Sequence, residues 1–416
     1  REFKLADLTF VLNVLSFGLL VMPLSQILMW NQPNYALIKQ ENVAKSAQSN
    51  KLARSQKPDI YYIILDGMER SDYLKSVFQI DDSDFTTFLK ANGFYIATDS
   101  HSNYPYTILS MSSSLNMQYL NLSGDQKERD WHPLYPMIED NEVMKFLKQE
   151  GYKCVHLDSA WSVTRNSPKA DQVFNLTWAN SFVSTAAALT PLGVHFKYIH
   201  PIHDELRSHR LRILHTLADI APSPGPKFVF AHVLMPHMPF LFGANGEPIN
   251  GSLNMHMQEW TDKDGYKNQV TFLLKELKIA LQTVLDRSET SPIIIIQGDH
   301  GAGSTAEFDK TEPSADFLRE RLSIFNAYHL PPNEKGNGNK NQASVLYDSI
   351  TPVNSFRTIF NDYFQAKLPL LPDKSFYSPF GSPFQLRDVT EEIAEPQMQP
   401  QIPTTSTPSQ NQPLQP

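Results

Sequence analysis

The segments IYYIILDG (60–67) and PIIIIQGDHG (292–301) are two short apolar runs that each end beside an aspartate and a glycine. Both runs are β-branched or aromatic and continuous rather than alternating, which is typical of strands buried in a parallel sheet. YKCVHLD (152–158) and KFVFAHVL (227–234) are further strand candidates. Helical patterns lie between the runs, at residues 84–92, 141–149 and 266–287. This alternation predicts an α/β fold with a doubly wound, mostly parallel central sheet flanked by helices.

The composition excludes several classes of protein. Of 416 residues, 41% are hydrophobic and 19% are charged, which is ordinary for a globular chain and argues against wholesale disorder, collagen or a coiled coil. The net charge of −8, without a long basic run, predicts no nucleic-acid partner. Because Cys154 is the only cysteine, neither a disulfide framework nor a cysteine-based zinc site is possible.

The two ends of the chain differ from its middle. Residues 8–30 carry no charge, and at about 1.5 Å per residue they exceed a hydrocarbon core of ~30 Å. They predict a transmembrane helix, with a secretory signal peptide or a buried helix as the alternatives. Residues 31–57 then form a juxtamembrane linker and residues 58–384 the catalytic domain. Residues 385–416, rich in proline and glutamine, predict a disordered tail.

Polar residues follow the two strongest strand candidates. Asp66 comes directly after the first, and Asp299 and His300 come directly after the second. Ligands of open α/β sheets bind outside the carboxyl ends of the strands. Oxygen and nitrogen ligands together suit zinc or manganese. Each loop alone is more readily interpreted as a turn, but their equivalent positions at two strand ends favour a shared metal site.

Four other features could contribute to a site. Thr107 stands at the apparent start of a helix, as a helix cap or as a nucleophile activated by a nearby metal. His237 lies between two prolines in a stiff loop, as a substrate contact or as a surface histidine. Arg70, shortly after Asp66, is a candidate for binding a substrate anion. The histidines and arginines of residues 194–215 read as a solvated helix, with an anion site as the alternative.

His232 lies within the strand candidate at 227–234. Its position inside an apolar run predicts a packed core histidine rather than a ligand.

In this order the quoted elements resemble the alkaline phosphatase superfamily. Within it the chain is similar to the sulfatase-like hydrolase/transferase branch, which includes lipoteichoic acid synthases and phosphoethanolamine transferases. The resemblance covers about residues 58–363. It rests on PDIYYIILDG (58–67), SNYPYT (102–107), GPKFVFAHVLMPHMPF (225–240) and IIIIQGDHG (293–301).

The resemblance implies specific roles for the residues that match. Asp66, Asp299 and His300 become ligands of one divalent metal ion, zinc or manganese. Thr107 becomes the fourth ligand and the nucleophile that carries a covalent ester, and His237 becomes a substrate contact. A single tightly held metal is expected, because no Asp-x-x-x-His pair of the two-metal phosphatases occurs.

The resemblance also sets the expected activity. We expect a membrane-anchored, extracytoplasmic enzyme that cleaves or transfers a phosphate-containing group of the phosphoglycerol or phosphoethanolamine type, with a membrane lipid as donor. One alternative is a phosphodiesterase, phosphonate-type or sulfuric ester hydrolase with water as acceptor, and another is a non-catalytic binding domain. Sulfate esters are disfavoured, because the Cys- or Ser-x-Pro-x-Arg pattern of true sulfatases is missing.

Overall fold

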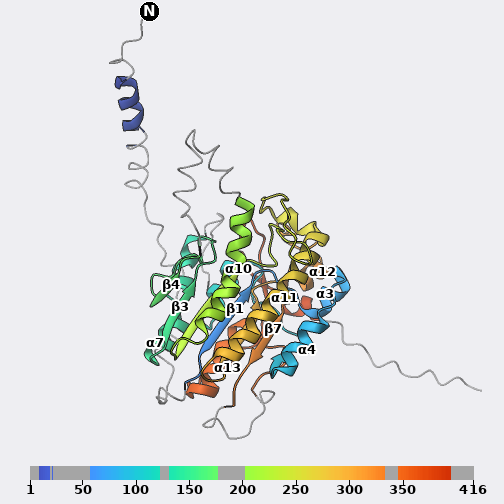
Figure 1. Ribbon diagram of the computed structural model, residues 1–416. Coiled ribbons are helices and arrows are strands. Elements are labelled where there is room, and N and C mark those ends of the chain that lie inside the picture. Colours follow the sequence, from blue (N-terminus) through green and yellow to red (C-terminus); the bar gives the residue numbers. More distant parts are fainter. Residues whose placement is uncertain are drawn as a thin grey trace, which may run out of the picture.

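The computed structural model describes residues 9–18, 21, 57–121, 131–176, 202–332 and 345–394. A seven-stranded sheet forms the centre of these residues, in the order β2-β7-β6-β1-β5-β3-β4 (Figure 1). Its strands are β1 (Ile60–Leu65), β2 (Phe94–Ile96), β3 (Lys153–Leu157), β4 (Gln172–Phe174), β5 (Lys227–Val233), β6 (Ile293–Gly298) and β7 (Asn326–His329). The four strand candidates of the sequence are β1, β3, β5 and β6, so these predictions are confirmed.

Four neighbouring pairs of strands run parallel. β1 lies between β5 and β6, and β3 lies between β5 and β4. The exception is β7, which pairs antiparallel with both β6 and β2. All six residues of β1 and all six of β6 are buried, as expected where both faces of a sheet are covered. The predicted mostly parallel α/β sheet is therefore confirmed.

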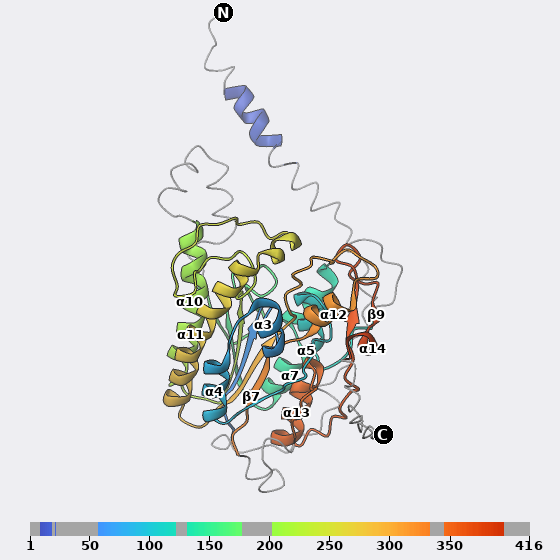
Figure 2. The same ribbon diagram turned by 90° about the vertical axis from the view of Figure 1, so that its right-hand side faces the viewer.

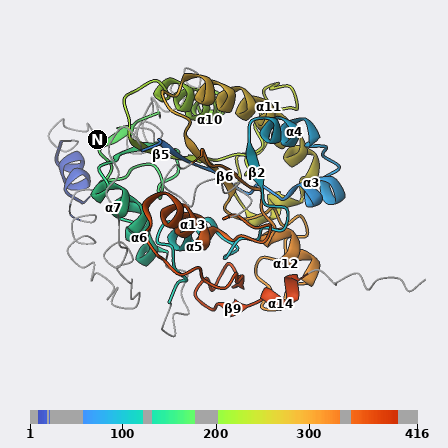
Figure 3. The ribbon, with the colours of Figure 1, turned by 90° about the horizontal axis from the view of Figure 1, so that it is seen from below.

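Helices cover both faces of this sheet (Figure 3). One face carries α3 (Ser71–Phe78), α4 (Ser83–Ala91), α10 (Ile202–Ile220) and α11 (Lys263–Arg287). The other carries α5 (Thr107–Ser114), α6 (Tyr135–Glu139), α7 (Glu142–Gln149) and α13 (Pro352–Phe364). The three helices predicted from periodicity correspond to α4, α7 and α11. Asn141 caps α7, because its side chain accepts from the Met144 N–H.

The helix expected within 194–215 is α10, but it is not simply solvated. Its inward side buries Arg207, His209 and Arg210. Arg210 donates to Pro239 O over 2.8 Å and to Gln269 Oε1 over 3.3 Å. Residues 194–201 lie outside the described residues. The solvated-helix interpretation was wrong for this face, since long basic side chains can be buried wherever carbonyl or amide oxygens accept from them.

Ordered structure continues past residue 384, where the sequence analysis starts the tail. The two-stranded sheet of β8 (Phe376–Tyr377) and β9 (Arg387–Asp388) is followed by α14 (Thr390–Ile393), which lies beside α12 (Ala315–Leu322) (Figure 2). Val389 and Ile393 are buried. The tail predicted from residue 385 therefore begins too early, because these apolar side chains anchor the segment. Residues 395–416 lie outside the described residues.

Residues 9–18 of the predicted membrane segment are helical. Across the described ranges, no helix combines the length and the apolar character that a bilayer span requires. The rest of 8–30, apart from residue 21, and residues 31–56 of the predicted linker lie outside the described residues.

Candidate active site

The carboxyl ends of β1 and β6 bring the two acidic loops side by side. The strand register pairs Leu65 with Gly298, so Asp66 and Asp299 follow at the same level of the sheet. The Gly67 N–H donates to Asp299 Oδ1 over 2.9 Å. Gly67 has a φ of +75°, and a Cβ atom there would lie 2.5 Å from the Trp260 ring. The close approach of these loops thus requires a glycine.

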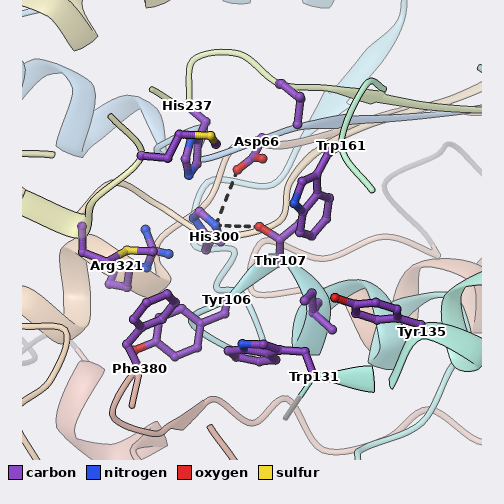
Figure 4. A pocket seen from close by; sticks show the side chains of 14 residues that line it. Asp66, Tyr106, Thr107, Trp131, Tyr135, Trp161, His237, His300, Arg321 and Phe380 are labelled. Atoms are coloured by element: carbon purple, nitrogen blue, oxygen red, sulfur yellow. Dashed lines mark hydrogen bonds and ion pairs between the residues drawn. The ribbon is translucent and has the colours of Figure 1, made fainter. Parts of the chain in front are cut away.

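Four of the predicted residues converge at this edge, and Figure 4 shows three of them, Asp66, Thr107 and His300. Ligand atoms of Asp66, Asp299 and His300 all lie within 4.8 Å of one another. His300 Nε2 is 3.6 Å from Asp66 Oδ1 and 3.4 Å from Asp299 Oδ2. Thr107 Oγ1 lies 3.1 Å from the same nitrogen.

Thr107 is the first residue of α5 rather than its cap. The N-cap is Tyr106, which has extended backbone angles and makes no capping hydrogen bond with its side chain. The Thr107 hydroxyl faces His300 instead. The helix-cap alternative is therefore wrong, and the hydroxyl stands at the positive end of the helix, within reach of the acidic cluster.

The cluster places two carboxyl groups next to each other in a buried site. Asp66 Oδ1 and Asp299 Oδ2 are buried and have no hydrogen-bond partner. Burial, followed by the charge of Asp66, raises the pKa of Asp299 to about 7. Burial also acts to raise the pKa of Asp66, but His237 and two neighbouring histidines outweigh it and hold that pKa below its ordinary value. Two buried carboxyl groups this close favour a cation between them.

The chemistry of the donor set fits one divalent cation. Two carboxylate oxygens, one imidazole nitrogen and one hydroxyl oxygen suit zinc or manganese. His300 Nδ1 donates to Gly301 O over 2.9 Å, which leaves Nε2 directed at the carboxylates. Burial lowers the pKa of His300 well below its ordinary value, so the ring is in the neutral form that binds metals.

Two further histidines adjoin the cluster. His237 lines the pocket beside Asp66, and its Nδ1 donates to Met238 O over 2.7 Å, so that Nε2 remains for a ligand. His232 is fully buried within β5, as predicted for a core residue. It also lies against the site, because its Nε2 is 3.3 Å from Asp66 Oδ2 while its Nδ1 contacts Thr164 Oγ1 at 2.8 Å. The sequence analysis did not predict that His232 contacts Asp66.

A pocket of about 250 Å³ opens onto Thr107. Its polar lining gathers around the cluster, where Asp66, Thr107, His237 and His300 face it. Aromatic side chains form much of the remaining wall, namely Tyr106, Trp131, Tyr135, Trp161 and Phe380. The pocket thus joins a reactive polar end to an apolar wall.

Arg70 does not join this pocket. Its guanidinium forms a double hydrogen bond with Asp72, at 2.8 Å for both, and pairs with Asp99 at 3.1 Å. It lines a different hollow with Asp72, Asp99 and His101. The structure therefore does not place Arg70 at the substrate, because two carboxylates already pair with its charge.

The structure adds Arg321 of α12, which the sequence analysis did not single out. This buried side chain lines the same pocket as Thr107 and His300. In the sequence it stands in ADFLRERL, which resembles the charged face of any surface helix. The aromatic wall was also missed, since its members are scattered between residues 106 and 380.

No protein-family model matches the chain, and no curated protein sequence matches it. Solved structures do share its fold. The C-terminal periplasmic domain of EcEptC from Escherichia coli, in complex with Zn, aligns with a TM-score of 0.54 at 12% identity, over 82% of this chain and 94% of that one. A second structure of the same domain aligns with the same TM-score and identity.

A second relative in structure is larger than this chain. The integral membrane protein lipooligosaccharide phosphoethanolamine transferase A from Neisseria meningitidis aligns with a TM-score of 0.50 at 13% identity. The alignment covers 83% of this chain and 61% of that protein. These likenesses show that the chain shares its fold with these two domains, in agreement with the α/β fold that the sequence predicts.

Proposed function

We propose that this chain, whose domain has the fold of phosphoethanolamine transferase periplasmic domains, is a membrane-anchored metalloenzyme acting outside the cytoplasm. It cleaves or transfers a phosphate-containing group, of the phosphoglycerol or phosphoethanolamine type, through a covalent ester on Thr107. The observation that carries this proposal is the position of the Thr107 hydroxyl, 3.1 Å from His300 Nε2 at the floor of the pocket.

Asp66, Thr107, Asp299 and His300 would hold the metal ion. A divalent cation bound there supplies Lewis acidity, which polarises a phosphoryl oxygen and lowers the pKa of a hydroxyl. The complex of a structurally similar domain with Zn supports zinc, and the mixed oxygen and nitrogen donors are also compatible with manganese.

The chain's own residues then carry the two halves of the reaction. Thr107 Oγ1 loses its proton and attacks phosphorus, a P–O bond to Thr107 forms, and the bond to the leaving alcohol breaks. The leaving oxygen takes up a proton. An acceptor hydroxyl or water then attacks the phosphothreonine, transfers its own proton away and restores the Thr107 hydroxyl.

His237 is suited to handle a proton in these steps. Its Nδ1 hydrogen bond to Met238 O orients the ring at the pocket wall and leaves Nε2 available to a substrate. Burial lowers the pKa of His237, so the neutral ring can accept a proton from the attacking hydroxyl and return it to the leaving oxygen.

The apolar wall and the uncharged N-terminal segment support a lipid donor. A membrane anchor at residues 8–30 would hold the domain at the bilayer surface, and the aromatic side chains would contact the donor beside its phosphate. Whether the acceptor is an alcohol or water decides between a transferase and a hydrolase.

Chelation tests this proposal. The zinc-loaded protein should cleave an aryl phosphodiester and a lipid donor in vesicles. It should lose both activities in a strong chelator, and added zinc or manganese should restore them. A chelated, metal-free protein that keeps full activity would refute the mechanism. Analysis of the lipid products with and without a hydroxylated acceptor distinguishes transfer from hydrolysis.

A further inference from the structure

Arg321 is a buried cation at the reactive end of the pocket. It belongs to α12, it is about 1% exposed, and it lines the pocket together with Thr107 and His300. Figure 4 shows its guanidinium beside His300, on the side of Tyr106 and Phe380.

The arginine contacts the two loops that carry the reacting groups. Its Nε donates to Pro105 O over 2.7 Å, two residues before Thr107. Its Nη1 donates to Gly301 O over 2.7 Å and to Ala302 O over 2.5 Å, just after His300. The rings of Tyr106, Trp260 and Phe308 surround the guanidinium carbon at 5.0–5.7 Å from their centres.

These contacts fix the side chain through backbone carbonyls and not through a direct salt bridge. Among the described residues, no carboxylate forms an ion pair with Arg321, and Nη2 donates no hydrogen bond. Nη2 makes no hydrogen bond with these residues and is not fully enclosed by protein atoms, and Arg321 lines the pocket, so Nη2 is accessible from the pocket. A buried guanidinium without a direct salt-bridge partner is costly, and an anionic ligand that accepts from Nη2 would reduce that cost.

We propose that Arg321 binds a non-bridging oxygen of the substrate's phosphoryl group through Nη2, an inference that rests on the proposed function. Guanidinium groups bind phosphate oxygens with short, charge-assisted hydrogen bonds. The contacts of Nε and Nη1 orient the group in advance, so that little side-chain entropy is lost when the anion binds. Arg321 is thus the residue that selects an anionic substrate, in the role that the sequence had suggested for Arg70.

Arg210 is a matched control. It is also a buried arginine, it donates to Pro239 O and Gln269 Oε1, and no carboxylate among the described residues forms a salt bridge with it. It lies on α10 and does not line the pocket. Replacing either arginine by lysine keeps one positive charge and removes one buried guanidinium group. Only the Arg321 change affects a group that faces the ligand.

Inorganic phosphate is the probe, and its affinity for the zinc-loaded protein is measured by calorimetry. We expect Arg321→Lys to weaken phosphate binding at least about tenfold, which is about 1.4 kcal/mol, while zinc content and thermal unfolding stay close to wild type. Arg210→Lys should change the affinity by less than about threefold. A folded, zinc-loaded Arg321→Lys protein with wild-type phosphate affinity would overturn the inference. So would an equal loss in both variants, or no binding of millimolar phosphate by the wild type.

If Arg321→Lys does not fold, a crystal of the wild-type protein with phosphate gives the answer. A phosphate oxygen in hydrogen-bond contact with Arg321 Nη2 supports the inference, and a phosphate bound away from Arg321 rejects it. Because neither measurement requires turnover, the outcome is separate from that of the proposed function. A protein without turnover whose phosphate affinity still depends on Arg321 would reject the covalent reaction and retain this site.

Discussion

Replacing Thr107 by alanine should abolish turnover and leave the fold in place. Thr107 is at the start of α5, and its hydroxyl makes no capping bond that the helix would lose. Alanine is a good helix former, so the backbone should be unaffected. The variant lacks only the oxygen that stands 3.1 Å from His300 Nε2 and the methyl group next to it.

The size of the loss follows from the lack of a substitute hydroxyl. Ser110 lies three residues (~4.5 Å) further along α5. It is buried, and its Oγ lies 3.4 Å from Ser102 Oγ. Tyr106 lines the wall, and its hydroxyl lies 3.2 Å from Phe308 O and 3.0 Å from Ser378 O, which share its single hydrogen. Neither can take the position of Thr107, so we expect at least a ~10³-fold loss of kcat, or about 4 kcal/mol of barrier.

Thr107→Ser is the matched control, because it keeps the oxygen and removes only a methyl group. The assay compares wild type, alanine and serine variants on an aryl phosphodiester and on lipid vesicles, after zinc content and thermal unfolding have been checked. The serine variant should retain measurable turnover. An alanine variant within tenfold of wild type on both substrates would show that Thr107 is not the nucleophile.

Three further results are expected. Asp299→Asn should raise the melting temperature of the metal-free protein, because it removes a buried charge next to Asp66, and it should reduce the thermal stabilisation by zinc. If zinc stabilises the variant as much as wild type, Asp299 is not a metal ligand. Burial, followed by the charge of Arg70, lowers the pKa of His101 from its ordinary 6.5 to about 4, so the contribution of His101 to the stability of the fold is fully present above pH 6.5 and is lost, by up to about 3 kcal/mol, as the pH falls towards 4. His101→Gln should flatten the pH dependence of urea-unfolding stability between pH 6.5 and 4, and an equally steep loss of stability in the variant would assign the pH dependence to other groups. Gly67→Ala should destabilise the fold by about 1–3 kcal/mol and weaken zinc binding, because φ at position 67 is positive and the added Cβ would meet Trp260. A wild-type melting curve with normal zinc content would show that the turn tolerates a side chain.

The sheet centre and the cluster of Asp66, Asp299 and His300 were predictable because local sequence specifies them. β1 and β6 are continuous apolar runs, and parallel strands deliver the residues after them to one edge. β7 was not predictable, because NAYH is short and its reversed direction depends on pairing with β6 and β2. The start of the tail was misplaced because two apolar residues, Val389 and Ile393, suffice to anchor α14.

The arginines show where reasoning from sequence fails. Arg70 follows Asp66 closely, but Asp72 two positions later already pairs with it, a partner visible in the sequence once α3 is recognised. Arg321 looks like a surface charge in its own helix, and only the tertiary fold brings carbonyls from residues 105, 301 and 302 to hold it. The burial of a long polar side chain is decided by what packs over it, and periodicity does not contain that information.

The mass of the intact protein after incubation with membrane lipid vesicles tests the central claim most directly. Zinc-loaded wild-type protein should gain the mass of one transferred phosphate-containing group, and fragmentation should locate it on Thr107. Thr107→Ala should gain no mass under the same conditions. An adduct on any other residue, or lipid turnover that proceeds without an adduct even after rapid acid quenching, would contradict the covalent mechanism.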